Sequence, residues 1–228
     1  MERRLDCRRK INPMVKLFSD FKHIAREFYS GKTFVAFDTE TTGLHPNEEH
    51  VIEIGAIKFN CEGLIEEPFN ILIKPPVPVS QFITDLTHIT NEMLENCPSM
   101  AQVLPEFLNY IGTENTYLIG HNVPFDIQFI DAELSRASLP AIKNLAFDTL
   151  QLARWAYPEF SYFPEKGQYK LQSLAARFKI NVEVAHRACD DARVCKELFH
   201  QIIKDTLSRQ KDYEISNEKS IFLLETIY

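Results

Sequence analysis

The sequence lacks the cysteine pattern of a disulfide-stabilised protein. Its five cysteines, at positions 7, 61, 97, 189 and 195, contain no Cys-x-x-Cys pair, and their number is odd. Free thiols in a reducing compartment are the better interpretation, and a disulfide framework is excluded.

Long apolar runs are also missing. No segment reaches the ~18 consecutive apolar residues that suggest a membrane-spanning helix. The charged start MERRLDCRRK is followed by no continuous apolar segment of the kind that a secretory signal contains. We therefore expect a cytoplasmic protein that has no membrane partner.

Basic residues are too few for nucleic-acid binding by charge alone. The 228 residues include 25 Lys and Arg against 32 Asp and Glu, which gives a net charge of -7. Because charge-driven nucleic-acid binders are usually basic, a polyanionic partner would need a local basic patch or a bound cation. The 45% hydrophobic content allows one sizeable core, in one domain with extensions or in two small domains.

The hydrophobic periodicity predicts a mixed α/β sheet. A strand over residues 33–38 precedes a hairpin, whose strands at 51–59 and 64–73 are joined by the turn Asn60-Cys61-Glu62-Gly63. Short strands at 117–119 and 146–147 then alternate with helices, as in α/β folds. We expect the helices over residues 100–111, 124–137, 148–157, 170–178 and 188–205.

The ends of the chain differ from its middle. Residues 1–30 form an N-terminal extension, in which apolar residues three or four apart predict an amphipathic helix over 14–28. This helix either packs on the domain or binds a partner. Residues 31–208 form the main domain. Residues 209–228 are polar and then apolar, and they form a disordered tail, a packed edge or a docking segment.

Two carboxylates end the apolar run of FVAFDTETTGL, residues 34–44. In a strand, Asp38 and Glu40 point to the same face, where two anions repel and raise each other's pKa. A divalent cation would relieve the repulsion, and Mg²⁺ or Mn²⁺ prefers such oxygen ligands. The alternative is an ordinary Asp-x-Glu triplet on the surface.

Further acidic residues lie at the starts of two helices. Asp126 follows the strand at 117–119, where it could also be an ordinary partner of the helix dipole. His186 stands five residues before Asp191, and Asp191 stands four before Cys195, so Asp191 should face the interior. Ligands collect at this edge of open α/β sheets. Four carboxylates there could hold two cations ~4 Å apart, as in two-metal phosphoryl chemistry.

Taken together, DTE at 38–40, HNVPFD at 121–126 and HRACDD at 186–191 resemble the three motifs of the DEDDh family. These proteins are 3′–5′ exonucleases with a ribonuclease H-like fold. The stretches EEHVIEIGAIKF, LTHIT, FDTLQLAR and LQSLAARF are similar to those of epsilon-type proofreading exonucleases of bacterial DNA polymerase III. The resemblance covers residues 32–206 and implies a mixed five-stranded sheet flanked by helices.

The resemblance also implies a catalytic role for each motif residue. Asp38, Glu40, Asp126 and Asp191 would hold two Mg²⁺ or Mn²⁺ ions, and Asp190 is the nearest competitor for the last position. His186 would take the proton from the attacking water, a role suited to a side chain whose unperturbed pKa is about 6.5. Bound cations would also explain how an acidic protein holds DNA.

Substrate contacts are implied mainly for the loop after the first carboxylates. Gly43 would permit a tight turn there, and Leu44 would meet a base, unless it simply caps the core. The chain departs from the family pattern at three positions. Some members carry glutamate in place of Phe82 and histidine in place of Thr87, and glycine is usual in place of His88. The expected contact residues are Thr39, Thr41, Thr42, Gly43, Leu44, Thr87, His88, His121 and Asn122.

The resemblance implies a metal-dependent 3′–5′ exonuclease that acts on DNA 3′ ends in proofreading or repair, with a DNA polymerase catalytic subunit as a candidate partner. An enzyme that trims RNA is the first alternative, because the motifs bind metal and phosphate and do not distinguish the sugar. A catalytically silent docking module is the second alternative, and the complete set of four carboxylates and His186 argues against it.

Overall fold

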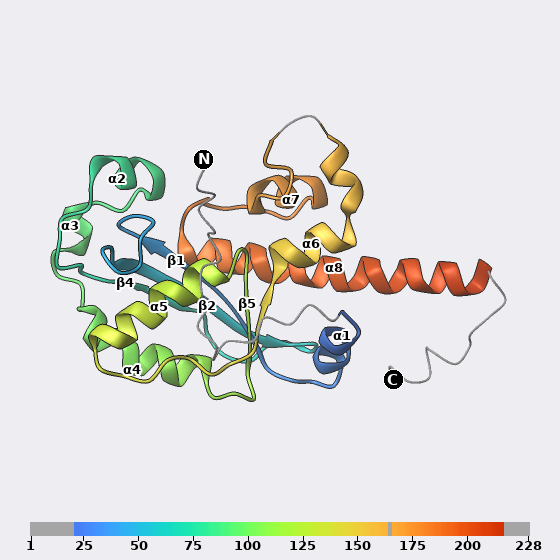
Figure 1. Cartoon of the computed structure of the whole chain (residues 1–228), viewed down its shortest axis with the longest axis horizontal. Helices are drawn as coiled ribbons and strands as arrows, with labels where there is room; N and C mark the ends of the chain where they lie inside the picture. Colours follow the sequence, from blue (N-terminus) through green and yellow to red (C-terminus); the bar gives the residue numbers. More distant parts are fainter. Residues whose placement is uncertain (1–20, 164–165, 217–228) are drawn as a thin grey trace, which may run out of the picture.

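The computed structural model describes residues 21–163 and 166–216, which fold around a mixed sheet (Figure 1). The sheet has the order β3–β2–β1–β5–β6, and β4 lies along the same edge of β2 as β3. β1 pairs antiparallel with β2 and parallel with β5, and β5 pairs parallel with β6. The strands are β1 Phe34–Thr41, β2 Val51–Asn60, β3 Gly63–Leu64, β4 Phe69–Leu72, β5 Tyr117–Gly120 and β6 Ala146–Asp148.

The sheet is five strands wide, as predicted, although it contains six strands. The expected strand at 64–73 divides into β3 and β4 around Pro68, which has no N–H to donate to a ladder. The turn before β3 is confirmed. The side-chain oxygen of Asn60 accepts hydrogen bonds from the backbone N of Glu62 at 2.8 Å and of Gly63 at 3.2 Å.

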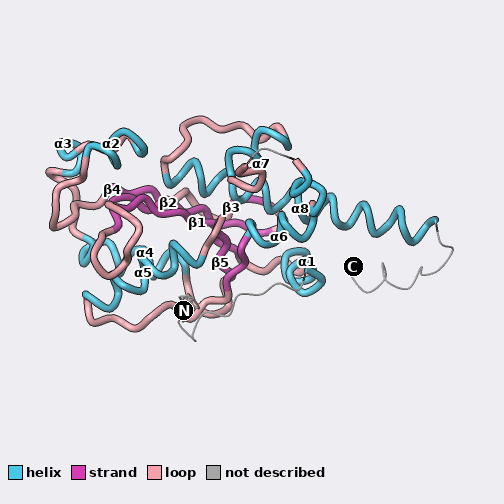
Figure 2. Tube along the Cα trace, turned by 45° about the horizontal axis from the view of Figure 1, so that its top comes forward, coloured by secondary structure: helices cyan, strands magenta, loops and turns pink. Residues whose placement is uncertain are grey.

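β1 is buried on both faces, which explains its continuous apolar start. Phe34 and Ala36 belong to one core cluster, and Val35 and Phe37 belong to a second cluster on the opposite face. Figure 2 shows the strands between α4 and α5 on one side and α7 and α8 on the other. The main helices are α1 Phe21–Tyr29, α4 Met100–Ile111, α5 Pro124–Arg136, α6 Thr149–Ala156, α7 Leu171–Phe178 and α8 Ala188–Ser216.

Helix α1 is the described part of the predicted 14–28 helix, and its apolar residues pack on the domain. Of the two alternatives for this helix, the structure favours packing on the domain over binding a partner. Phe21, Ile24 and Phe28 are buried in the cluster that contains α8. The ring of Phe28 lies 5.5 Å from that of Phe199, and Phe21 stacks on Trp155 at 5.1 Å. Residues 14–20 lie outside the described residues.

Helix α8 is longer than the predicted 188–205. Its expected stripe is confirmed, because Ala188, Ala192, Cys195, Phe199 and Ile202 are all buried. The helix continues to Ser216 through RQKDYEIS, which contains good helix formers and no Gly or Pro. Figure 1 shows its far end extending beyond the sheet. Across residues 21–163 and 166–216, no helix is both long and apolar enough to cross a membrane.

Three short helices had not been predicted: α2 Gln81–Thr87, α3 Asn91–Leu94 and the 3₁₀-helix η1 Pro158–Tyr162. α2 and α3 begin at Ser80 and Thr90, whose hydroxyls accept from the backbone N three residues later, at 3.4 and 3.3 Å. Both helices contribute to a small core cluster beside Ile52 of β2. They are too short to show a helical period in the sequence.

Candidate active site

Asp38 and Glu40 lie near the end of β1, on the face that α8 covers. By strand alternation they share the face of Phe34 and Ala36, and both carboxylates are half-buried. Glu40 stands opposite Glu53 of β2, and the register shifts immediately after it. Such β-bulges are common beside active sites, because they redirect the strand.

The first residues of α8 pack directly against β2 at Gly55. In the register of β1 and β2, Gly55 stands opposite Asp38. A Cβ at position 55 would lie 2.1 Å from the backbone C of Ala188 and the backbone N of Cys189. Only glycine therefore lets the first turn of α8 come this close. Among the described residues, Glu40, His186 and Asp191 each offer a ligand atom, and these atoms all lie within 4.8 Å of one another.

Asp126 reaches the same place from α5, which follows β5, the parallel neighbour of β1. It is 3% exposed. One of its carboxylate oxygens accepts hydrogen bonds from the backbone N of Thr39 at 3.0 Å and from the hydroxyl of Thr39 at 2.8 Å. Thr39, predicted as a substrate contact, therefore joins the second motif to the first.

Asp191 lies nearer the other site residues than its neighbour Asp190. Its two carboxylate oxygens accept from Gln172 Nε2 at 2.9 Å and from the backbone N of His186 at 3.1 Å. Asp190 instead pairs with Arg193 at 2.6 Å and accepts from the backbone N of Glu183 at 2.8 Å. The geometry thus favours Asp191 over Asp190 as the site carboxylate.

The electrostatics of the site favour a bound cation. Burial, followed by the charges of Asp126, Glu40 and Asp191, raises the pKa of Asp38 well above its usual range. Burial is also the largest cause for the other three groups, raising the pKa of Glu40 to about 8, of Asp126 to about 7 and of Asp191 to about 6. Positive charge would relieve this cost, and the donors are the oxygens that Mg²⁺ and Mn²⁺ prefer.

The metal-free protein is expected to lose stability between pH 6 and 8. The folded-state pKa values of about 8, 7 and 6 lie above those of unfolded chains, so the folded state binds more protons. This contribution to the free energy of unfolding is complete below the unfolded pKa and is lost as the pH rises through the folded values. Melting temperatures in chelator should therefore fall over this range, and added Mg²⁺ should raise the melting temperature at pH 8. A flat profile with no Mg²⁺ effect would contradict the cation site.

Thr39→Val should lower kcat by roughly 10- to 100-fold, the range found when the partner of a metal ligand is removed. The substitution deletes the hydroxyl that donates to Asp126 and preserves the shape of a strand residue. Steady-state hydrolysis measures the effect. Thr39→Ser retains the hydroxyl and serves as the control. Equal activity of the two variants would show that the hydrogen bond does not orient Asp126.

In the loop after β1, Leu44, which was predicted to meet a base, lies in solvent. Leu44 is 71% exposed, so the interpretation that it caps the core is wrong. Thr41 donates to the carbonyl of Gly43 at 2.6 Å, and Thr42 donates to Glu49. Gly43 has no positive φ, so the expected tight turn is not the reason for glycine. A Cβ there would lie 2.7 Å from the Glu49 carboxyl group.

Two predicted substrate contacts use their polar atoms inside the protein. Thr87 is buried, donates to the carbonyl of Ile83 at 2.9 Å and accepts from the backbone N of Ile89 at 3.2 Å. The ring nitrogens of His121 lie 3.0 Å from the hydroxyl of Thr149 and 2.8 Å from the carbonyl oxygen of Tyr169. Burial lowers the pKa of His121 to about 4.

Two others are exposed at left-handed turns. His88 ends α2 with φ 60°, and Asn122 precedes α5 with φ 67°. The backbone N of Asn122 donates to Asp148 at 2.8 Å. Among the described residues, the side chains of His88 and Asn122 make no contact that assigns either of them a role.

Sequence reasoning missed Glu53 and Arg187, which adjoin the predicted site. Glu53 is fully buried, and its carboxylate pairs with Arg187 at 2.7 Å. A signal was present, because Glu53 is a single acidic residue in the otherwise apolar VIEIGAI of β2. Its importance depends on the strand register, which that pattern does not give.

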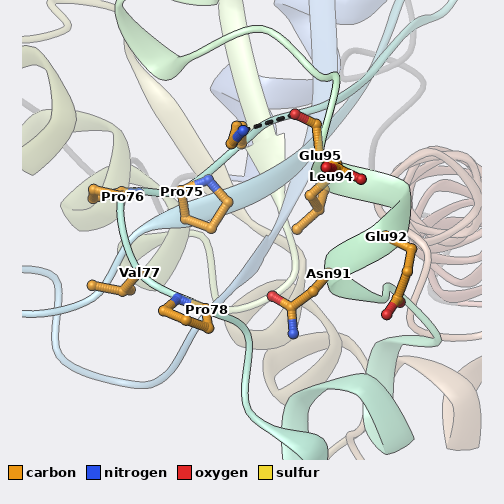
Figure 3. Close-up of a pocket in the computed structure, with 9 residues that line it drawn as sticks. Pro75, Pro76, Val77, Pro78, Asn91, Glu92, Leu94 and Glu95 are labelled. Carbon is orange, nitrogen blue, oxygen red and sulfur yellow. Dashed lines mark hydrogen bonds between the residues drawn. The ribbon is translucent and has the colours of Figure 1, made fainter.

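A cavity of about 420 Å³ lies outside the candidate site, between residues 74–78 and α3 (Figure 3). Pro75, Pro76 and Pro78 form one wall, the side chain of Asn91 points toward it, and Glu92 lines the cavity farther from the prolines. Lys74 Nζ donates to the carbonyl of Glu95 at 2.8 Å. No predicted site residue lines this cavity.

Comparisons with known proteins show which sequences this chain resembles. A family model described as Exonuclease (RNase T) matches residues 35–199. DNA polymerase III subunit epsilon of Treponema pallidum is 38% identical over 187 residues, which are 82% of this chain and 80% of that protein. DNA polymerase III of the PolC type from Caldanaerobacter subterraneus is 35% identical over 171 residues, which are 75% of this chain and only 12% of that protein.

A solved structure with the same fold holds DNA. Exonuclease X, in complex with 5′-overhanging duplex DNA, superposes with a TM-score of 0.57 and 26% sequence identity. The match covers 75% of this chain and 91% of that chain. The mixed sheet flanked by helices is therefore the ribonuclease H-like fold of exonucleases.

Proposed function

This chain belongs to the RNase T exonuclease family, and on that premise we propose that it is a metal-dependent 3′–5′ exonuclease that removes nucleoside 5′-monophosphates from the 3′ ends of DNA. The observation that carries the proposal is the convergence of Glu40, His186 and Asp191, whose ligand atoms lie within 4.8 Å of one another. Asp126, from α5, accepts two hydrogen bonds from Thr39, which lies between Asp38 and Glu40.

Asp38, Glu40, Asp126 and Asp191 would hold Mg²⁺ or Mn²⁺, and we propose two ions. The donor set fits, because it consists of carboxylate oxygens whose raised pKa values favour a neighbouring cation. Bound cations would supply positive charge against the phosphodiester and its departing oxygen.

His186 is the proposed general base. It is exposed at the start of α8, and its backbone N is held by Asp191 at 3.1 Å. Its ring would take a proton from the water whose oxygen forms the new bond to phosphorus. The bond from phosphorus to the 3′-oxygen of the next nucleotide then breaks, and that oxygen takes a proton from solvent. Proton transfer of this kind typically contributes about 10²- to 10⁴-fold.

The loop after β1 is the proposed contact for the terminal nucleotide. Leu44, which is 71% exposed in the loop that carries Thr41, Thr42 and Gly43, would lie against a base. Thr39 would act through Asp126. We retain His88 and Asn122 as candidate contacts because they are exposed, whereas Thr87 and His121 would act through the backbone that they hold in place.

We further propose a role in proofreading, alongside a DNA polymerase catalytic subunit. The similarity to an epsilon subunit and to part of a PolC-type polymerase supports this role. Residues 209–228 are the candidate docking segment, and their described part, to Ser216, continues α8. The proposal places the chain in the cytoplasm, where thiols stay reduced, in keeping with the free Cys61, Cys97, Cys189 and Cys195.

The test is hydrolysis of a 5′-labelled primer that carries a 3′ mismatch on its template, with Mg²⁺ or Mn²⁺. The same primer fully paired, single-stranded DNA and single-stranded RNA run beside it. We expect a ladder that shortens from the 3′ end, faster for the mismatch, and is lost in chelator and in Asp38→Asn. Faster shortening of RNA would support the RNA-trimming alternative, and intact substrates throughout would reject the proposal.

A further inference from the structure

Glu53 is a buried carboxylate that lies beneath the start of α8 and is unused in the proposed chemistry. It is 0% exposed and stands opposite Glu40 in the register of β1 and β2. A charge in such a position is costly unless it is paired and hydrogen-bonded. The partners of Glu53 therefore indicate why the chain keeps a carboxylate there.

All of its hydrogen-bond partners among the described residues come from the first residues of α8 and the residue before it. Arg187 Nη2 donates to Oε1 at 2.7 Å, and Arg187 Nε lies 3.2 Å from both carboxylate oxygens. The backbone N of Ala188 donates to Oε2 at 3.0 Å. Glu53 therefore binds a guanidinium and a free N–H of the helix start together, which fixes both the position and the direction of α8.

Two candidate active-site residues flank these contacts. His186 immediately precedes Arg187, and Asp191 lies three residues after Ala188, one turn into the helix. His186 has φ 60°, a conformation that a non-glycine residue adopts only when its surroundings hold it. Any movement of Arg187 and Ala188 on β2 would carry His186 and Asp191 away from Glu40.

We propose that Glu53 and Arg187 are positioning residues, which hold the start of α8 on β2 so that His186 and Asp191 meet Glu40. This inference rests on the proposed function for its kinetic consequences, but not for its structural ones. Arg187 is the residue to change, because its side chain is 30% exposed, whereas that of Glu53 is 1% exposed. Glutamine at position 187 retains an N–H donor for the Glu53 carboxylate that would otherwise be left unpaired.

The kinetic test compares Arg187→Gln with Arg187→Lys, which retains the charge but not the forked donor. Arg187→Gln should lower kcat by about 10- to 100-fold with little change in KM for DNA, and should raise the Mg²⁺ concentration needed for half-maximal rate. Arg187→Lys should recover part of the loss. Lys58→Gln, which removes an ion pair with Glu66 near the other end of β2, should match the parent chain. An increase in KM at unchanged kcat, steeper with salt, would instead place Arg187 on the DNA backbone and overturn the proposal.

Amide hydrogen exchange gives a readout that needs no substrate. In metal-free protein, Arg187→Gln and Glu53→Gln should each speed exchange in residues 188–192 by about tenfold or more, the change expected when local opening becomes easier. The distal part of α8, near residue 203, should exchange as before. Unchanged exchange at 188–192 would overturn the positioning role. Faster exchange in a chain that hydrolyses no nucleic acid would uphold it and reject only the proposed function.

Discussion

His186→Asn is expected to lower kcat by about 10²- to 10⁴-fold, the contribution of a general base, while the melting temperature stays within a few degrees. Asparagine is the informative replacement, because it adopts the left-handed backbone that His186 occupies at φ 60°. It also keeps the backbone N that Asp191 accepts from. The variant therefore removes the imidazole ring and little else.

Single-turnover hydrolysis of the mismatched primer measures this effect without interference from product release. Lys179→Asn is the matched control, since Lys179 is exposed, has φ 57° and lies at the opposite end of α7 from Gln172, the partner of Asp191. Its rate should equal that of the parent chain. Hydrolysis by His186→Asn within threefold of the parent rate would exclude His186 from proton transfer.

Gly55→Ala is expected to remove most of the activity through packing alone. The new methyl group would lie 2.1 Å from the backbone of Ala188 and Cys189, a contact that no side-chain rotation relieves. Overpacking of this kind typically costs about 1–3 kcal/mol, and occasionally more. Because α8 must shift to make room, the displacement of His186 and Asp191 should lower kcat by about 10²-fold or more.

Urea denaturation and kcat together test this expectation. Gly43→Ala is the matched control for stability, because the three atoms nearest to its methyl group would belong to the Glu49 side chain, which can rotate away, and not to backbone. Its free energy of unfolding should stay within about 0.5 kcal/mol of the parent value. A Gly55→Ala variant as stable and as active as the parent chain would show that α8 does not depend on this close approach.

The sequence alone predicted those features that depend on the spacing of residues within one segment. Two carboxylates one residue apart, after the apolar run at the start of β1, pointed to a cation site, and strand alternation placed Asp38 and Glu40 on one face. The spacing from Asp191 to Cys195 predicted that Asp191 faces inward, and it is 5% exposed. The alternation of strands and helices predicted the mixed sheet, and the family resemblance implied its width of five strands.

The remainder depended on contacts between distant segments. Glu53 stands out as the single acidic residue of an apolar strand, but its role follows only from the register that places it opposite Glu40 and from its ion pair with Arg187. The role of Gly55 depends on where α8 crosses β2, which periodicity does not specify. His121 and Thr87 carry groups suited to substrate binding, but their partners Tyr169 and Ile83 satisfy those groups internally. The residue type alone does not show whether its polar atoms form hydrogen bonds inside the protein or remain free to bind a substrate.

The length of α8 has a mechanical consequence. A helix of 29 residues measures about 43 Å. Its buried stripe, from Ala188 to Ile202, packs against the sheet along about half of that length. A force applied at Ser216 would act on this packed stretch before it reached the first turn. The residues that meet Glu40 are thus shielded from tension at the distal end, so that end could bear a load without disturbing hydrolysis.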